Sequence, residues 1–144
     1  MNFKKQQEII NEYINENYLK YLMEYNIPNK PIITNDYIDF DRFKNNFICF
    51  IEFDTSNFPI TYKDDCSLTE NLIVNFYLTH RNNTPELLNE LMLDSTSAFF
   101  NMIRENQVKN VIEQKINKID FFKYIEGKNN IFCSKIVLEL NIEV

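Results

Sequence analysis

The sequence predicts an α+β domain in which helices pack on a mainly antiparallel or mixed β-sheet. Three observations carry this prediction. Residues 3–25 repeat apolar side chains every three or four positions, which is typical of one face of a helix. Residues 84–104 show the same period after a helix-start signal. Residues 131–144 alternate apolar and polar side chains behind a turn cluster, which indicates a long C-terminal β-hairpin.

The composition favours one folded domain over residues 1–144. With 44% hydrophobic and 25% charged residues, the chain resembles neither a disordered nor a membrane-spanning protein. Gly127 is the only glycine, which excludes the P-loop, the dinucleotide fingerprint and the nucleophile elbow. The net charge of −6 argues against a surface that binds DNA phosphates. No apolar run approaches the length of a membrane span, so no membrane association is expected.

The N-terminal helix is expected over Phe3–Tyr25, and Asn11 is the one polar residue on its apolar face. Pro28 and Pro31 are expected to end this helix, because neither continues the hydrogen-bond ladder. The apolar stripe consists of Ile10, Ile14, Tyr18, Tyr21, Leu22 and Tyr25.

Four strands are predicted before the central helix. The connection over residues 26–46 contains a short one at Ile32–Thr34. Phe47–Phe53 is apolar at nearly every position, which favours a strand covered on both faces or lying at an interface. Phe58–Tyr62 contains a proline and is expected at a sheet edge, and Leu72–His80 alternates as a strand with one apolar face.

The central helix is expected to begin with Thr84 as N-cap and Pro85 in the first turn, and to end near Arg104. Val108–Ile119 continues a helical period, and three interpretations stay open for it. It is a continuation of a long helix, a second short helix, or a flap. The cluster Gly127–Asn130 then predicts the hairpin turn.

The last predicted strand, Ile131–Val144, is long for a compact domain. Its 14 residues would span roughly 43–46 Å, whereas a domain of this size has a radius of gyration of about 15 Å. The strand is therefore expected to bend, bulge or project. Its apolar face also predicts a contact between subunits in a closed cyclic oligomer, formed edge to edge or face to face. The expected contact residues are Ile136, Leu138, Leu140 and Ile142.

No catalytic residue, cofactor or metal site is predicted. His80 is the only histidine, and its place at a strand end favours a structural role. An EF-hand loop counted from Asp41 lacks the glycine required at its sixth position. The three cysteines lack metal-ligand spacing and are interpreted as free thiols. Cys49 and Cys133 are expected to be buried within strands, and Cys66 to be accessible on a polar loop.

Taken in order, these elements resemble the tail-terminator and tail-completion proteins of tailed bacteriophages. Those proteins are small neck components with an N-terminal helix, a β-hairpin, a central helix and a final hairpin on a mixed sheet. The long connection 26–46 and the segment 108–119 depart from this pattern. The matching pieces are Ile10–Tyr25, Phe47–Phe53, Leu72–Leu78, Thr84–Leu88, Phe122–Gly127 and Ile131–Val144.

The resemblance implies a structural virion protein and not an enzyme. Its subunits would form a homo-oligomeric ring that joins the capsid portal to the tail, assembled in the host cytoplasm. Its partners would be other phage neck, portal or tail proteins, and DNA would only pass through the channel. A hypothesis from another class is a small cytoplasmic ferredoxin-like regulatory or adaptor module that acts as a dimer.

A polar loop predicted over Lys63–Asn71 carries three acidic residues, Asp64, Asp65 and Glu70. In a ring, this loop is expected to face the channel, where acids repel passing phosphates over the 8–10 Å that physiological salt allows. An ordinary solvated loop is the alternative.

Overall fold

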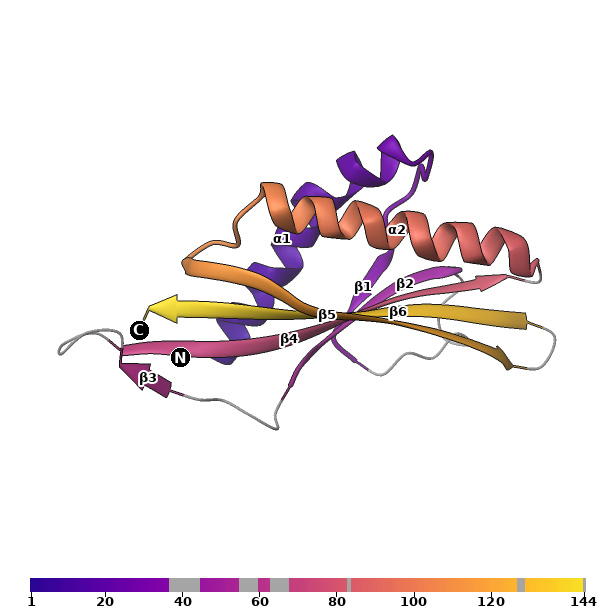
Figure 1. Ribbon diagram of the computed structural model, residues 1–144. Coiled ribbons are helices and arrows are strands. Elements are labelled where there is room, and N and C mark those ends of the chain that lie inside the picture. The colour runs from indigo at the N-terminus through magenta and orange to yellow at the C-terminus, as the bar shows by residue number, and fades with distance from the viewer. Residues whose placement is uncertain (37–44, 55–59, 63–67, 83, 127–128, 144) are drawn as a thin grey trace.

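The computed structural model describes residues 1–36, 45–54, 60–62, 68–82, 84–126 and 129–143. In these residues two helices lie on one face of a six-stranded mixed sheet (Figure 1). The predicted α+β class is confirmed, together with its N-terminal helix, central helix and C-terminal hairpin. In chain order the elements are α1 (Phe3–Glu24), β1 (Ile32–Thr34), β2 (Phe47–Phe53), β3 (Ile60–Tyr62), β4 (Leu68–Asn82), α2 (Pro85–Glu105), β5 (Val111–Glu126) and β6 (Asn129–Glu143).

The sheet has the strand order β1-β2-β4-β6-β5, and β3 pairs with one end of β4. β1 and β2 are parallel, and every other pair is antiparallel. Because β4 and β5 both run antiparallel to β6, they are parallel to each other, and β6 is inserted between them. The segment from β4 to β6 is thus a split βαβ unit. The described residues contain one such unit, whereas a ferredoxin-like fold consists of two.

The end of α1 is a Schellman motif, which differs from the predicted proline stop. Asn26 adopts a left-handed conformation with φ 62°. Its amide donates to the carbonyl of Met23 at 3.1 Å, and the amide of Ile27 donates to that of Leu22 at 3.0 Å. Leu22 and Ile27 are both buried, as the motif favours. The last carbonyls are therefore satisfied before the chain reaches Pro28.

The main core lies between the two helices and the sheet face beneath them. Phe99 of α2 packs edge-on against Tyr18 of α1, with ring centroids 5.2 Å apart. The same ring lies 4.9 Å from Phe76 of β4. The polar intrusion on α1, Asn11, donates to Asn35 Oδ1 at 2.7 Å and so ties the helix to the segment after β1.

The predicted early strands are confirmed, but β4 extends beyond both predicted ends, and β3 is described only from Ile60, because Phe58 and Pro59 lie outside the described residues. In β2, the consecutive residues Ile48 and Cys49 are both fully buried, so both faces of this strand are covered there. β1 has the predicted bounds, and β3 pairs with β4 alone, as expected for an edge. β4 begins at Leu68, inside the segment Lys63–Asn71 that was predicted to be a loop. That prediction is wrong for residues 68–71, because they pair with β3 or β6.

The three interpretations of Val108–Ile119 as helix or flap are wrong, because β5 begins at Val111. Two bulges account for part of the helical period. The pairing of β5 with β6 skips one residue between Val111 and Glu113 and another between Ile116 and Lys118. Each bulge places residues three apart on the same face of the sheet. The second bulge therefore places Ile116 and Ile119 on one face, three residues apart, which is a spacing that a helix would also give.

The last strand, β6, is long because it pairs with an equally long neighbouring strand. β6 contains 15 residues and pairs along its length with β4, which is equally long. The long strands twist strongly across the sheet, and the bulges fall on β5 (Figure 1). Within the described residues, no helix is both long enough and apolar enough to cross a membrane.

Candidate assembly interface

The predicted contact residues of β6 lie in the interior of the chain itself. Ile136, Leu138 and Leu140 are fully buried, and Ile142 is 5% exposed. They belong to the core that contains both helices. Because β6 lies between β4 and β5, both of its edges are already paired. The structure therefore corrects the prediction of a subunit contact through these four side chains.

A group of exposed aromatic side chains lies on the neighbouring strand, β5, while other large apolar side chains are exposed on α1 and α2. Phe121, Phe122 and Tyr124 expose 48%, 45% and 49% of their surface. No other described strand pairs with the outer side of β5. A strand in this position presents backbone N–H and C=O groups to whatever approaches it. This strand edge with its aromatic side chains is the candidate site, and we call residues 118–126 the distal β5 edge.

Aromatic side chains lie on both faces of the distal β5 edge. Phe121 is paired with Ser134, whose hydroxyl is bonded to α2, so Phe121 lies on the helix-bearing face. Phe122 is paired with Cys133, which lies on the opposite face of the sheet. An added strand would therefore contact apolar surface above and below its own plane.

The two halves of β5 differ in regularity. Both bulges fall before Lys118, whereas residues 118–126 pair with β6 without a register shift. Bulges are one of the devices by which natural edge strands avoid pairing with other chains. The first half of β5 contains such bulges, whereas the distal β5 edge contains none.

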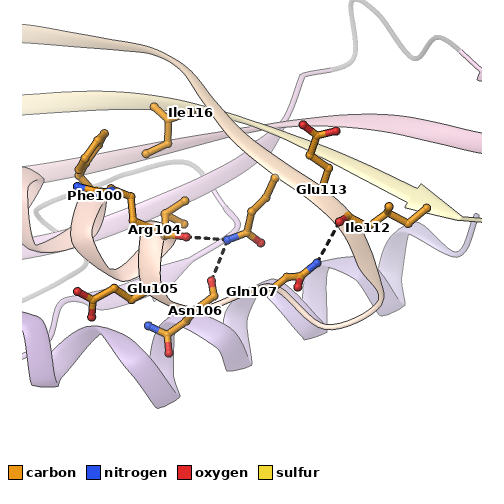
Figure 2. A pocket seen from close by; sticks show the side chains of 10 residues that line it. Phe100, Arg104, Glu105, Asn106, Gln107, Ile112, Glu113 and Ile116 are labelled. Carbon is orange, nitrogen blue, oxygen red and sulfur yellow. Dashed lines mark hydrogen bonds between the residues drawn. The ribbon is translucent and has the colours of Figure 1, made fainter.

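A pocket with a volume of about 700 Å³ opens between the end of α2 and the start of β5 (Figure 2). Gln114 forms one wall, and its Nε2 donates to the carbonyls of Ile103 and Asn106, both at 2.8 Å. Its Oε1 accepts from the amide of Val108 at 2.7 Å. The side chain therefore caps the C-terminus of α2 from a strand, so this wall of the pocket connects β5 to the end of α2.

Two tyrosines of α1 also form hydrogen bonds with the end of α2. Tyr13 OH donates to the carbonyl of Asn106 at 2.5 Å. Tyr21 OH donates to a carboxylate oxygen of Glu105 at 2.6 Å and accepts from Asn106 Nδ2 at 2.9 Å. The hydrogen bond to the Glu105 carboxylate raises the pKa of Tyr21 above its usual value. These polar residues around the pocket are therefore engaged in hydrogen bonds that stabilise the fold.

His80 belongs to a buried polar cluster beneath α2. Its Nε2 lies 2.9 Å from Ser95 Oγ, and its ring stacks on Phe47 with centroids 4.1 Å apart. Tyr18 OH donates to the carbonyl of Ser95 at 2.7 Å. Burial lowers the pKa of His80 to about 3, so the ring is neutral at physiological pH. The imidazole is 3% exposed, and this arrangement supports the predicted structural role.

The cysteine predictions are confirmed where the structure describes them. Cys49 and Cys133 are free and buried. Burial raises the pKa of both thiols above the usual value, so neither has thiolate character at neutral pH. Cys66 lies outside the described residues. The described part of the chain holds no cluster of three or more His, Cys, Asp or Glu side chains arranged for a metal, and Asp41 lies outside it.

The predicted acidic loop is only partly described. Asp64 and Asp65 lie outside the described residues. Glu70 lies within β4, where it is paired with Ile60 and Ile142, so its assignment to a loop is wrong. Its carboxylate is 17% exposed and lies 3.9 Å from the amino group of Met1. The expectation that Asp64 and Asp65 face a channel stays a prediction.

From the sequence, Phe121 and Phe122 are interpreted as core or subunit-contact aromatics, but their place on an edge strand was missed. The signal that identifies it is the run from Ile119 to Tyr124, in which Phe121 and Phe122 are adjacent and flanked by charges. Adjacent residues in a strand point to opposite faces, so both faces of this strand are apolar. No protein-family model matches the chain, and no curated protein shows significant similarity to it.

Proposed function

We propose that this protein is a structural subunit of the virion of a tailed bacteriophage. In this proposal it is a neck, connector or tail-terminator protein whose copies form a ring between the capsid portal and the tail. The observation that carries the proposal is the distal β5 edge, a regular strand edge with three exposed aromatic side chains. Its function is to hold surfaces together, and no turnover is involved.

Leaving a strand edge of this kind exposed to water is unfavourable. Aromatic side chains are enriched at protein interfaces, where they bury a large apolar area. A regular, unpaired strand edge also offers a row of hydrogen-bonding groups to another chain. A small domain that exposes both features together is suited to association.

The order of the elements is the second support. An N-terminal helix, early strands, a central helix and a closing hairpin on a mixed sheet agree with the architecture of the tail-terminator and tail-completion proteins. In this setting the partners are further copies of the chain and other neck, portal or tail proteins. The protein assembles in the host cytoplasm and remains in the virion, where DNA passes through the ring without specific binding.

The decisive experiment removes the gene from the phage that encodes it. We expect separate filled heads and tails in electron micrographs, and we expect the wild-type protein in purified particles at a fixed number of copies. Complementation with Phe122→Asp/Tyr124→Asp should fail to join heads to tails. Lys115→Asp/Asn117→Asp, at two exposed positions in the bulged half of the same strand, is the matched control for the loss of apolar contact. Infectious particles that lack the protein would refute the proposal.

A further inference from the structure

We infer that the distal β5 edge binds a second copy of itself, so that two chains pair antiparallel through residues 118–126. The two sheets then join into one continuous sheet around a two-fold axis at Phe122. This inference concerns the free protein and does not depend on the proposed function. It commits to one occupant of the edge, a second copy of this chain.

The pairing has to keep the faces of the sheet aligned. A two-fold axis perpendicular to the sheet carries each face onto the same face of the partner. Residues opposite each other must then point to the same side, so the axis passes through a residue and not between two residues. Only a few registers satisfy this condition over the distal β5 edge.

Charge selects one of these registers. With the axis at Phe122, Lys118 lies opposite position 126 of the partner strand, which is a glutamate in the sequence. Asp120, which also lies 3.3 Å from Lys118 Nζ of its own chain, then lies opposite Tyr124, so no two like charges lie opposite each other across the interface. Opposite charges directly across an antiparallel pair are favourable, and like charges are unfavourable.

The neighbouring registers lack this match. An axis at Asp120 or at Lys123 sets a charged residue against its own copy. An axis at Phe121 sets Lys118 against Tyr124 and Lys123 against Ile119, which leaves both lysines without an acidic partner across the interface. Among the registers with the axis at residues 120 to 123, the one centred on Phe122 is therefore the one in which aromatic contact and charge complementarity coincide.

Self-pairing also fits the two edges of the sheet better than head-to-tail pairing does. The opposite edge is formed by β1, which has three residues, whereas β5 has 16. A ladder between β5 and the partner's β1 would use only a small part of β5. A two-fold pair closes on two subunits, so this contact between two copies would have to open before a head-to-tail ring could form. The dimer is therefore inferred for the free protein.

The first test uses cross-linking at the axis. In a background with Cys66→Ser, Phe122→Cys places two thiols opposite each other, with Cα atoms about 4.5–5.5 Å apart. This lies within the range that a disulfide bridges. We expect most of the chain to become a disulfide-linked dimer under mild oxidation. Phe121→Cys is the matched control, because its two copies would be about 8 Å apart and should cross-link at least ten times more slowly.

The second test exchanges the charges. Lys118→Glu alone should weaken the dimer about tenfold in analytical ultracentrifugation, and Glu126→Lys alone should do the same. The double variant Lys118→Glu/Glu126→Lys restores the opposite charges, so its dissociation constant should return to within about threefold of wild type. Circular dichroism and thermal unfolding confirm that each variant is folded.

Three results would overturn the inference. The first is a wild-type protein that stays monomeric at the highest soluble concentration. The second is equal cross-linking of the Phe121→Cys and Phe122→Cys proteins, which would place the axis elsewhere. The third is a double charge variant that associates no better than either single variant, which would exclude this register.

Discussion

Gln114 holds the last turn of α2 through the carbonyl of Ile103, at a distance of 2.8 Å. The same amide also binds the carbonyl of Asn106 and the amide of Val108. A strand residue thus satisfies backbone groups that a helix C-terminus would otherwise leave without partners. Gln114 thus links β5 to the end of α2, as does Gln107, whose Nε2 donates to the carbonyls of Val111 and Ile112.

Replacement of Gln114 by leucine should therefore destabilise the fold. The variant retains the volume of the side chain but removes three hydrogen bonds from partly buried backbone groups. We expect the free energy of unfolding to fall by about 1–3 kcal/mol, measured by urea denaturation. Lys115→Leu, at the exposed neighbouring position, should change it by less than about 0.5 kcal/mol. Equal effects at the two positions would show that the cap has no energetic role.

His80 should make stability depend on pH. Its pKa is about 3 in the folded chain, against 6.5 for an ordinary histidine. Between these values the unfolded chain binds a proton that the folded chain does not, so stability falls as the pH decreases from 6.5 towards 3. The slope from this group approaches about 1.4 kcal/mol per pH unit.

The contribution of His80 can be separated from that of the carboxylates by substitution. His80→Gln has no group that titrates in this range. We therefore expect the pH dependence of its free energy of unfolding between pH 4.5 and 6 to be shallower than that of the wild type. Parallel curves for the two proteins would contradict the burial of a neutral imidazole.

The thiols should differ in reactivity. Cys49 and Cys133 are buried, and their raised pKa values disfavour the thiolate that reacts with labelling reagents. We expect one fast-reacting thiol in the folded protein, Cys66, and two more after unfolding in urea. Cys66→Ser should abolish the fast phase. Rapid labelling of Cys49 or Cys133 without denaturant would show that the strand faces are assigned incorrectly.

The acidic loop supplies a test that is conditional on the proposed ring. If Asp64 and Asp65 face the channel, changing both to lysine should attract the DNA backbone and slow ejection from intact particles. Glu70 is left unchanged, because it lies within the sheet. Glu12→Lys/Glu16→Lys makes the same change of charge at exposed positions of α1 and should leave the ejection rate unaltered. Equal rates for the two double variants would exclude channel lining.

Local sequence determined the helices and most of the strands. α1 and α2 were predictable because a 3.6-residue period and a cap depend only on residues near each other along the chain. The burial of Cys49 and Cys133 followed from the strand patterns around them. The same reasoning identified the apolar face of β6, but it did not show which surface would cover that face.

Tertiary structure decided the identity of β5 and the position of the exposed edge. The bulges in β5 place Ile116 and Ile119 on one face, opposite Leu138 and Ile136, at a spacing that a helix also produces. A bulge is defined by pairing with a distant strand, so the sequence of β5 alone does not distinguish these cases. For the same reason, only the position of β6 between β4 and β5 shows that the apolar face of β6 is buried within the chain. The same strand order shows that no described strand pairs with the outer side of the distal β5 edge.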